Sequence, residues 1–304
     1  MPKTAVNAAR HRQIIKAMDN NGRQDQNLNQ TQAATDAHVS HEQTLFAEPL
    51  FQIGNFTATN SLVNSWLVLV VIVILSLWLR RRISLVPGQL QNGFETLVDG
   101  FLGIFDSVTG SRARSLKYFP LVFAFFIFIL LSNWMGLLPG IGSIGQIVEH
   151  DGHALFVPYF RSGTADLNTT LALAIIGVVV SHIFGVAAIG AWKHLNKFIN
   201  LEAIIEIPKK VRQDPAVLLV NPIKLFVGLV ELIGEAAKLL SLSFRLFGNV
   251  FAGEILLASI SAILAFGLPL PFMFLEVIVG LVQATIFSML ILAYLTINTS
   301  AEEH

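Results

Sequence analysis

The feature that most constrains this chain is an uncharged apolar run at residues 62–79, which ends on three consecutive arginines at residues 80–82. At ~1.5 Å per helical residue, a run of this length spans a hydrocarbon core of ~30 Å. Residues 119–138 and 167–192 form two further uncharged apolar runs. Only 13% of the residues are charged, against about a quarter in an average soluble domain. The sequence therefore predicts an integral membrane protein.

Composition excludes several classes of function. The 20 basic and 20 acidic residues balance, so no basic excess is present for binding nucleic acid. Cysteine is absent, which rules out disulfides, iron–sulfur clusters, thiolate zinc sites and cysteine nucleophiles. No internal repeat is found, so an inverted-repeat transporter is not supported. No cofactor or metal is expected, because the acidic and histidine residues at 149–153 lack helical His spacing and favour a solvated loop.

The chain divides into a tail and a membrane domain. Residues 1–44 are polar, rich in Asn and Gln, and without an apolar period, which predicts a disordered tail. The tail lacks the apolar core of a signal peptide, so we expect it to remain in the mature chain. Residues 45–304 are predicted to form the membrane domain, beginning with a short apolar patch at residues 45–56.

Three more segments complete the predicted fold. Residues 90–106 place apolar side chains at helical spacing, which predicts an amphipathic helix along the interface. Residues 216–264 are too long for one perpendicular crossing and too charged to face lipid on all sides. After a Gly/Pro turn at 267–271, a last apolar stretch runs to residue 297. The predicted fold class is all-α, with five membrane helices of which the last two are long.

The distribution of Lys and Arg predicts the orientation of the chain. Residues 80–117 hold six and residues 193–214 hold five, whereas residues 140–166 hold only Arg161. Basic loops lie preferentially on the cytoplasmic side of a membrane. We therefore predict that the N-terminus is outside and the C-terminus is cytoplasmic.

Polar side chains form a stripe on each of the two last helices. At 100° per residue, one face of residues 216–264 carries Glu231, Lys238, Ser241, Arg245 and Asn249, and the opposite face carries Glu254. The second stripe comprises Glu276, Gly280, Gln283 and Phe287. Two long helices are therefore each expected to present a polar line to neighbouring protein.

Arg245 is the most informative of these residues. A guanidinium at mid-membrane costs at least ~2.5–3.5 kcal/mol and stays protonated, so Arg245 cannot carry a proton. Its fixed charge can instead attract a passing carboxylate and repel a cation. Glu254 and Glu276 differ, because a carboxyl group held away from bulk water can take up and release a proton. A fixed arginine between titratable carboxyl groups is the arrangement that a proton turnstile requires.

Structural interpretations of the same residues stay open. An ion pair between Arg245 and either Glu231 or Glu254 would only stabilise the packing of helices. Glu254 and Glu276 could likewise each serve only as a structural partner of a neighbouring side chain. Near the cytoplasmic end, the residues that could simply face water are Glu231, Glu235 and Lys238. Asn249 and Gln283 could do no more than bond a neighbouring helix.

The segment from Ser243 to Glu254, SFRLFGNVFAGE, resembles the arginine motif of subunit a of rotary F-type ATP synthases almost residue for residue. Supporting matches are VPG at 86–88, NWMGLLP at 133–139, ADLNTTL at 165–171 and LVQATIF at 281–287, in the order of that family. The resemblance covers residues 45–304, and the tail has no counterpart in these motifs.

This resemblance implies a proton-translocating stator subunit with two half-channels. Arg245 would face the proton-carrying carboxylate of each c subunit. The half-channel residues that the resemblance implies are Asn249, Glu254, Glu276 and Gln283, with Asp166 near the entry side and Glu231 near the cytoplasmic side. The implied partners are the c-subunit ring, the b-subunit peripheral stalk, the soluble catalytic head and the lipid of a bacterial inner membrane. Strong tilting of the last two helices is expected on the same ground, and family members vary at the position of Glu276.

Three rival functions make different predictions. A self-contained transporter or channel would conduct alone, whereas a stator subunit needs the c ring. A structural subunit of a respiratory complex would lose assembly before coupling on Arg245→Ala. A membrane-embedded hydrolase is disfavoured because no HExxH or GxSxG motif occurs. No GxxxxGK[ST] loop is present either, so the chain itself is not expected to be catalytic and nucleotide chemistry would belong to partners.

Overall fold

The computed structural model describes residues 47–54, 56–84, 88–138, 144–150, 153–199, 217–264 and 267–300. The predicted tail at residues 1–44 lies outside this part of the chain. Residues 145–157 belong to one compact unit, and residues 43–144 and 158–304 form a second, larger one. The larger unit holds every helix described below.

A two-stranded sheet occupies the segment that was predicted as a loop. It pairs β3 (Gly145–His150) with β4 (His153–Pro158). The sequence places Asp-Gly between two runs that contain Ile, Val, Leu and Phe, which is a hairpin signal that the loop prediction did not use. The side chains of residues 149–153 are not among those that the structure describes, so the solvated loop expected there stays a prediction.

The larger unit begins with a second hairpin where an apolar patch was predicted. Strands β1 (Pro49–Ile53) and β2 (Phe56–Thr59) pair antiparallel, and Gly54 between them has a φ of 63°. Glycine adopts this left-handed backbone without the Cβ clash that other residues meet. Helix α2 follows β2 directly and ends on the three arginines, whose positive charge is favourable at a helix C-terminus.

Seven α-helices are described in this unit. They are α2 (Asn60–Arg82), α3 (Gln89–Thr109), α4 (Arg112–Leu137), α5 (Leu167–Ile189), α6 (Ala191–Ile199), α8 (Val217–Ile263) and α9 (Pro269–Thr299). Among the described residues, α2, α4, α5, α8 and α9 are long and apolar enough to cross a membrane, which confirms the predicted five. Helix α8 has 47 residues, or about 70 Å at 1.5 Å per residue, and α9 has 31. The fold is therefore an all-α membrane fold with two long final helices.

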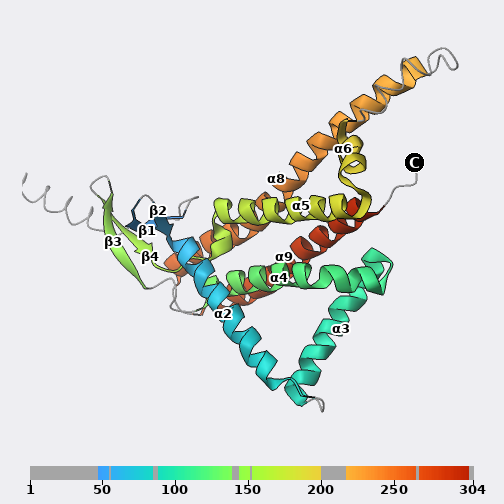
Figure 1. Ribbon diagram of the computed structural model, residues 1–304. Helices are drawn as coiled ribbons and strands as arrows, with labels where there is room; N and C mark the ends of the chain where they lie inside the picture. The colour runs from blue at the N-terminus through green and yellow to red at the C-terminus, as the bar shows by residue number, and fades with distance from the viewer. Residues whose placement is uncertain are drawn as a thin grey trace, which may run out of the picture. The chain divides into compact units, whose positions relative to one another are not determined.

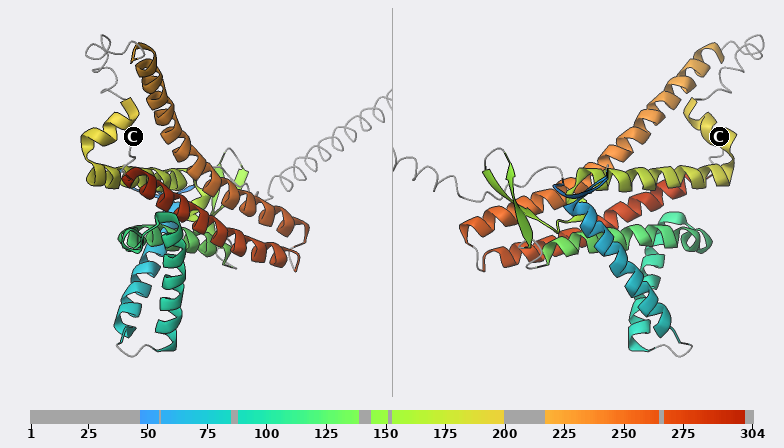
Figure 2. Two further views of the ribbon diagram at one scale, coloured as in Figure 1. Left: turned by 90° about the vertical axis from the view of Figure 1, so that its right-hand side faces the viewer. Right: turned by 60° about the vertical axis from the view of Figure 1, so that its left-hand side comes forward.

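Helices α4, α5 and α9 lie side by side, and α5 also packs on α8 (Figure 1). The N-terminal half of α8 diverges from α5 and α9, as Figure 2 shows, and most of its apolar side chains are exposed. The core between the helices is apolar and rich in phenylalanine; its largest fully buried members are Phe105, Tyr118, Ile129, Leu242, Leu246, Ile291, Leu292 and Leu295. This core fixes the middle of α8 against α5 and α9.

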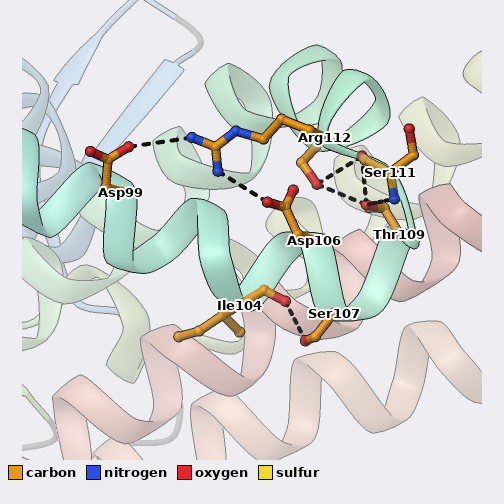
Figure 3. Close-up of polar contacts among 8 residues, drawn as sticks. Asp99, Ile104, Asp106, Ser107, Thr109, Ser111 and Arg112 are labelled. Carbon is orange, nitrogen blue, oxygen red and sulfur yellow. Dashed lines mark hydrogen bonds and ion pairs between the residues drawn. The ribbon is translucent and has the colours of Figure 1, made fainter.

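Helix α3 confirms the predicted amphipathic helix. Its buried residues Leu102, Phe105 and Thr109 recur at helical spacing. At the corner between α3 and α4, Arg112 lies between Asp99 and Asp106, with N–O distances of 3.3 and 3.0 Å (Figure 3). Hydrogen bonding from Ser115 and the nearby Arg112 guanidinium lower the pKa of Asp106 below its ordinary value. The interfacial position of α3 stays a prediction.

Candidate functional site

A seam of polar side chains joins α4 to α9. Asn133 Nδ2 donates to the Gly280 carbonyl at 3.3 Å, and Trp134 Nε1 donates to the Val277 carbonyl at 3.1 Å. The Thr164 hydroxyl donates to Asn133 Oδ1. Buried polar groups in a membrane protein must find such internal partners because lipid offers none. The NWMGLLP motif therefore contributes the bonds that fix α9 against α4.

Asp166 lies where the short 3₁₀ helix η2 (Gly163–Ala165) meets α5. It is 4% exposed, and its Oδ1 accepts from the backbone N–H of Asn168 at 3.1 Å, as an N-cap does. Its Oδ2 accepts from Ser61 Oγ of α2 at 3.1 Å. The geometry shows a residue that starts α5 and ties it to α2, and Asp166 does not line the cavity described next.

A cavity of about 50 Å³ lies among α4, α8, α9 and the segment before η2. Its lining residues are Asn133, Gly136, Leu137, Ser162, Val250, Gly253, Glu254, Leu257, Glu276, Val279 and Gly280. A site needs only ~10–15 Å³ of such volume to hold one water, so this cavity has room for more than one. Of the residues that line it, Glu254 and Glu276 are the ionisable ones. The structure therefore brings together two carboxyl groups that the sequence placed on separate helices.

Glu254 forms a buried ion pair with Arg161. Arg161 Nε donates to Glu254 Oε2 at 3.0 Å, and the two side chains are 7% and 21% exposed. The Arg161 guanidinium also lies over the Phe251 ring, 5.8 Å from its centroid. Glu254 thus pairs with a residue 93 positions away in the chain and not with Arg245.

Glu276 reaches across from α9 to α8 and lies against Gly253. A Cβ atom at Gly253 would overlap the Glu276 carboxylate, so the absence of a side chain there lets the two helices hold this group between them. Among the described residues, the structure shows no hydrogen bond or ion pair to the Glu276 carboxylate. The two glutamates of the cavity therefore differ in their partners.

Arg245 lies on the other side of α8 from the cavity. Its side chain is exposed, and its Nη2 contacts Ser241 Oγ at 3.2 Å. The neighbouring Phe244 is 53% exposed, and Leu256, three turns further along nearly the same face, is 38% exposed. Within the part of the chain that the structure describes, Arg245 takes part in no ion pair. The helical prediction that Arg245 and Glu254 lie on opposite faces is thus confirmed.

A second ionisable cluster joins α5, α6 and the N-terminal half of α8. Glu235 Oε1 pairs with Lys238 Nζ at 2.7 Å, and Glu235 Oε2 lies 3.4 Å from His182 Nε2. The other ring nitrogen of His182 lies 3.0 Å from His194 Nε2. Glu231, predicted near the cytoplasmic side, is half-buried one turn before Glu235. This cluster lies about 15 Å along α8 from Arg245, at 1.5 Å per residue.

The remaining predicted residues are Asn249 and Gln283, both half-buried. Neither lines the cavity, and among the described residues neither side chain has a hydrogen bond. Sequence reasoning missed the roles of Arg161, His182 and His194. The one available signal for Arg161 was that it is the single basic residue between two apolar spans whose connection is otherwise free of Lys and Arg.

These features define a polytopic α-helical membrane protein that encloses two carboxyl groups and carries an arginine on its outer helical face. Comparison with known proteins agrees with that class. The family model described as ATP synthase A chain matches residues 62–296. The chain belongs to this family.

Two relatives of this chain align with it over most of their length. ATP synthase subunit a of Syntrophobacter fumaroxidans is 33% identical over 242 residues, which cover 79% of this chain and 84% of that protein. ATP synthase subunit a of Trichlorobacter lovleyi is 32% identical over 254 residues, covering 84% and 92%. The chain is therefore an integral membrane component of an ATP synthase, with a role in the proton-translocating membrane sector.

Proposed function

We propose that this chain is the stator of the membrane sector, in which Arg245 faces a ring of c subunits that carry protons on carboxyl groups. One observation carries the proposal: the Arg245 side chain is exposed on a membrane helix and has no counter-ion among the described residues. An unpaired guanidinium facing lipid is expensive, so a carboxylate from another chain is the expected partner. Exposed residues on nearly the same face, such as Ala252 and Leu256, would pack against that partner.

The cavity on the opposite side of α8 would form part of the entry half-channel. Protons from outside would reach Glu254 and Glu276 through its waters and then protonate a rotor carboxylate. Asp166, Asn249 and Gln283 would line or support this path, Asp166 by holding the start of α5. A neutralised rotor carboxyl group can turn into lipid, because its charge has been removed.

The exit half-channel would run along the other half of α8. After nearly a full turn of the ring, the carboxyl group would release its proton toward the cytoplasm past Glu231, and Arg245 would then hold the resulting negative charge. The Glu235–His182 contact offers further proton acceptors on that side. Each charge that crosses gains ~2.3 kcal/mol per 100 mV of membrane potential.

The chemistry of ATP would be carried out by partner subunits. The chain would make no bond in the nucleotide, and the rotor would pass its torque to a soluble catalytic head, with a b-subunit stalk holding the stator in place. The orientation that follows from the basic loops places the N-terminus outside and the C-terminus in the cytoplasm. A bacterial inner membrane fits this arrangement.

Cross-linking tests the proposed contact. The chain has no cysteine, so an introduced thiol is unique. Ala252 is exposed and lies seven residues beyond Arg245, which returns to nearly the same helical face. In assembled complexes, oxidised Ala252→Cys should form a disulfide with a cysteine placed beside the rotor carboxylate. Ile74→Cys on α2, where the native side chain is 59% exposed, is the control and should not. Equal adducts, or none from Ala252→Cys, would contradict the proposal.

A further inference from the structure

The two carboxyl groups of the cavity have different electrostatic partners. Glu254 accepts a charge-assisted hydrogen bond from Arg161, whose side chain is 7% exposed. Glu276 lies against the backbone of Gly253, with no charged partner among the described residues. Both line the same cavity of about 50 Å³, so water can connect them.

Charge balance decides which of the two groups takes up a proton. Protonating Glu254 would leave the buried guanidinium of Arg161 beside a neutral group, and arginine cannot release its own proton to compensate. Protonating Glu276 instead removes the one carboxylate charge that no cation offsets. The ionisable groups that face Glu276 in the described structure are Glu254, across the cavity on α8, and Arg161 behind it.

We propose that Arg161 holds Glu254 as a permanently ionised ion pair, so that Glu276 alone of the two cavity glutamates accepts and passes on the proton. This inference rests on the proposed function and adds a division of roles within the entry path. Arg161 acts as a positioning residue, because it acts through Glu254. The ion pair would line the cavity with charges that do not change, and Glu276 would be the carboxyl group that gains and loses the proton.

Paired substitutions separate the two roles. ATP-driven proton pumping is measured in vesicles that carry the assembled complex, with subunit content checked on a gel. Glu276→Gln should lower the pumping rate about tenfold or more with assembly intact, as expected for loss of a proton-transferring group. Arg161→Gln and Glu254→Gln should each impair pumping or assembly, because each leaves one buried charge unpaired.

The double variant Arg161→Gln/Glu254→Gln is the decisive sample. It removes both charges together, so assembly should return and pumping should recover to within about threefold of the native rate. Its pH profile should match that of the native complex, because the titrating group Glu276 is retained. Native pumping in Glu276→Gln would overturn the proposal, and so would a double variant that fails to assemble or pumps no better than either single variant.

The result also separates this inference from the proposed function. If Ala252→Cys cross-links to the rotor but the double variant stays inactive, the stator assignment stands and the division of roles is wrong. If the cross-link fails while the double variant recovers, the cavity works as proposed but the rotor-facing surface lies elsewhere.

Discussion

Gly253→Ala should impair proton pumping because the new methyl group would occupy the space of the Glu276 carboxylate. Alanine in place of glycine favours the helix by ~1 kcal/mol. Overpacking costs ~1–3 kcal/mol, with the low end expected here because the displaced group ends a flexible side chain. The helix gain and the low-end overpacking cost therefore nearly cancel in the unfolding free energy, and the larger effect falls on the position of Glu276.

Gly100→Ala is the matched control. It lies inside α3, away from the residues assigned to either half-channel, and a Cβ there has no neighbouring atom within 4 Å. This variant should keep native pumping and gain ~1 kcal/mol of helix stability. Initial pumping rates in vesicles and the thermal midpoint of the purified complex measure both quantities. The combination of Gly253→Ala with Glu276→Asp, which is shorter by one methylene, should recover part of the lost pumping. If Gly253→Ala pumps as well as Gly100→Ala, the carboxylate need not lie against α8 and the reasoning fails.

Two further predictions concern stability. Asn133→Ala removes one hydrogen bond to Gly280 and one from Thr164. At ~0.6–1.7 kcal/mol each in a membrane protein, the loss is about 1–3 kcal/mol, and an unchanged thermal midpoint would contradict it. Because the pKa of Asp106 is lowered in the folded chain, its ionised form stabilises the corner between α3 and α4 at pH values above about 3.8. This contribution is lost as the pH falls through the lowered pKa of Asp106 in the folded chain. The protection factors of the α3 amides against hydrogen exchange should therefore fall at acid pH in the native chain, and Asp106→Asn should remove that acid-dependent step.

The membrane helices were predictable because each span satisfies its own backbone hydrogen bonds. In lipid a segment must form a helix by itself, so an uncharged run such as 62–79 suffices to predict α2. Helical geometry also predicted that Arg245 and Glu254 face opposite ways, since nine residues amount to two and a half turns. Boundaries were less accurate: the span predicted to end at residue 192 ends at Ile189, because Gly190 adopts a φ of 91°.

The ion pair between Arg161 and Glu254 was not predictable from the sequence. Its partners are separated by 93 residues, and neither helical nor strand periodicity relates them. Arg161 entered the prediction only as a charge in a loop count, and Glu254 only as a titratable group on a stripe. Which carboxylate has a counter-ion depends on how the segment before η2 packs against α8. That packing is a tertiary property, as is the contact that joins His182 to Glu235.

The central claim is that the fixed charge of Arg245 couples proton flow to rotation, and replacing that residue tests it most directly. ATP-driven pumping should be compared between the native chain, Arg245→Ala and Arg245→Lys in vesicles whose subunit content is verified. The account predicts that Arg245→Ala assembles fully and loses pumping, and that Arg245→Lys retains at most a small part of it, because a lysine does not reproduce the planar, delocalised guanidinium. Pumping at the native rate by an assembled Arg245→Ala complex would show that the arginine is packing, and would contradict the account.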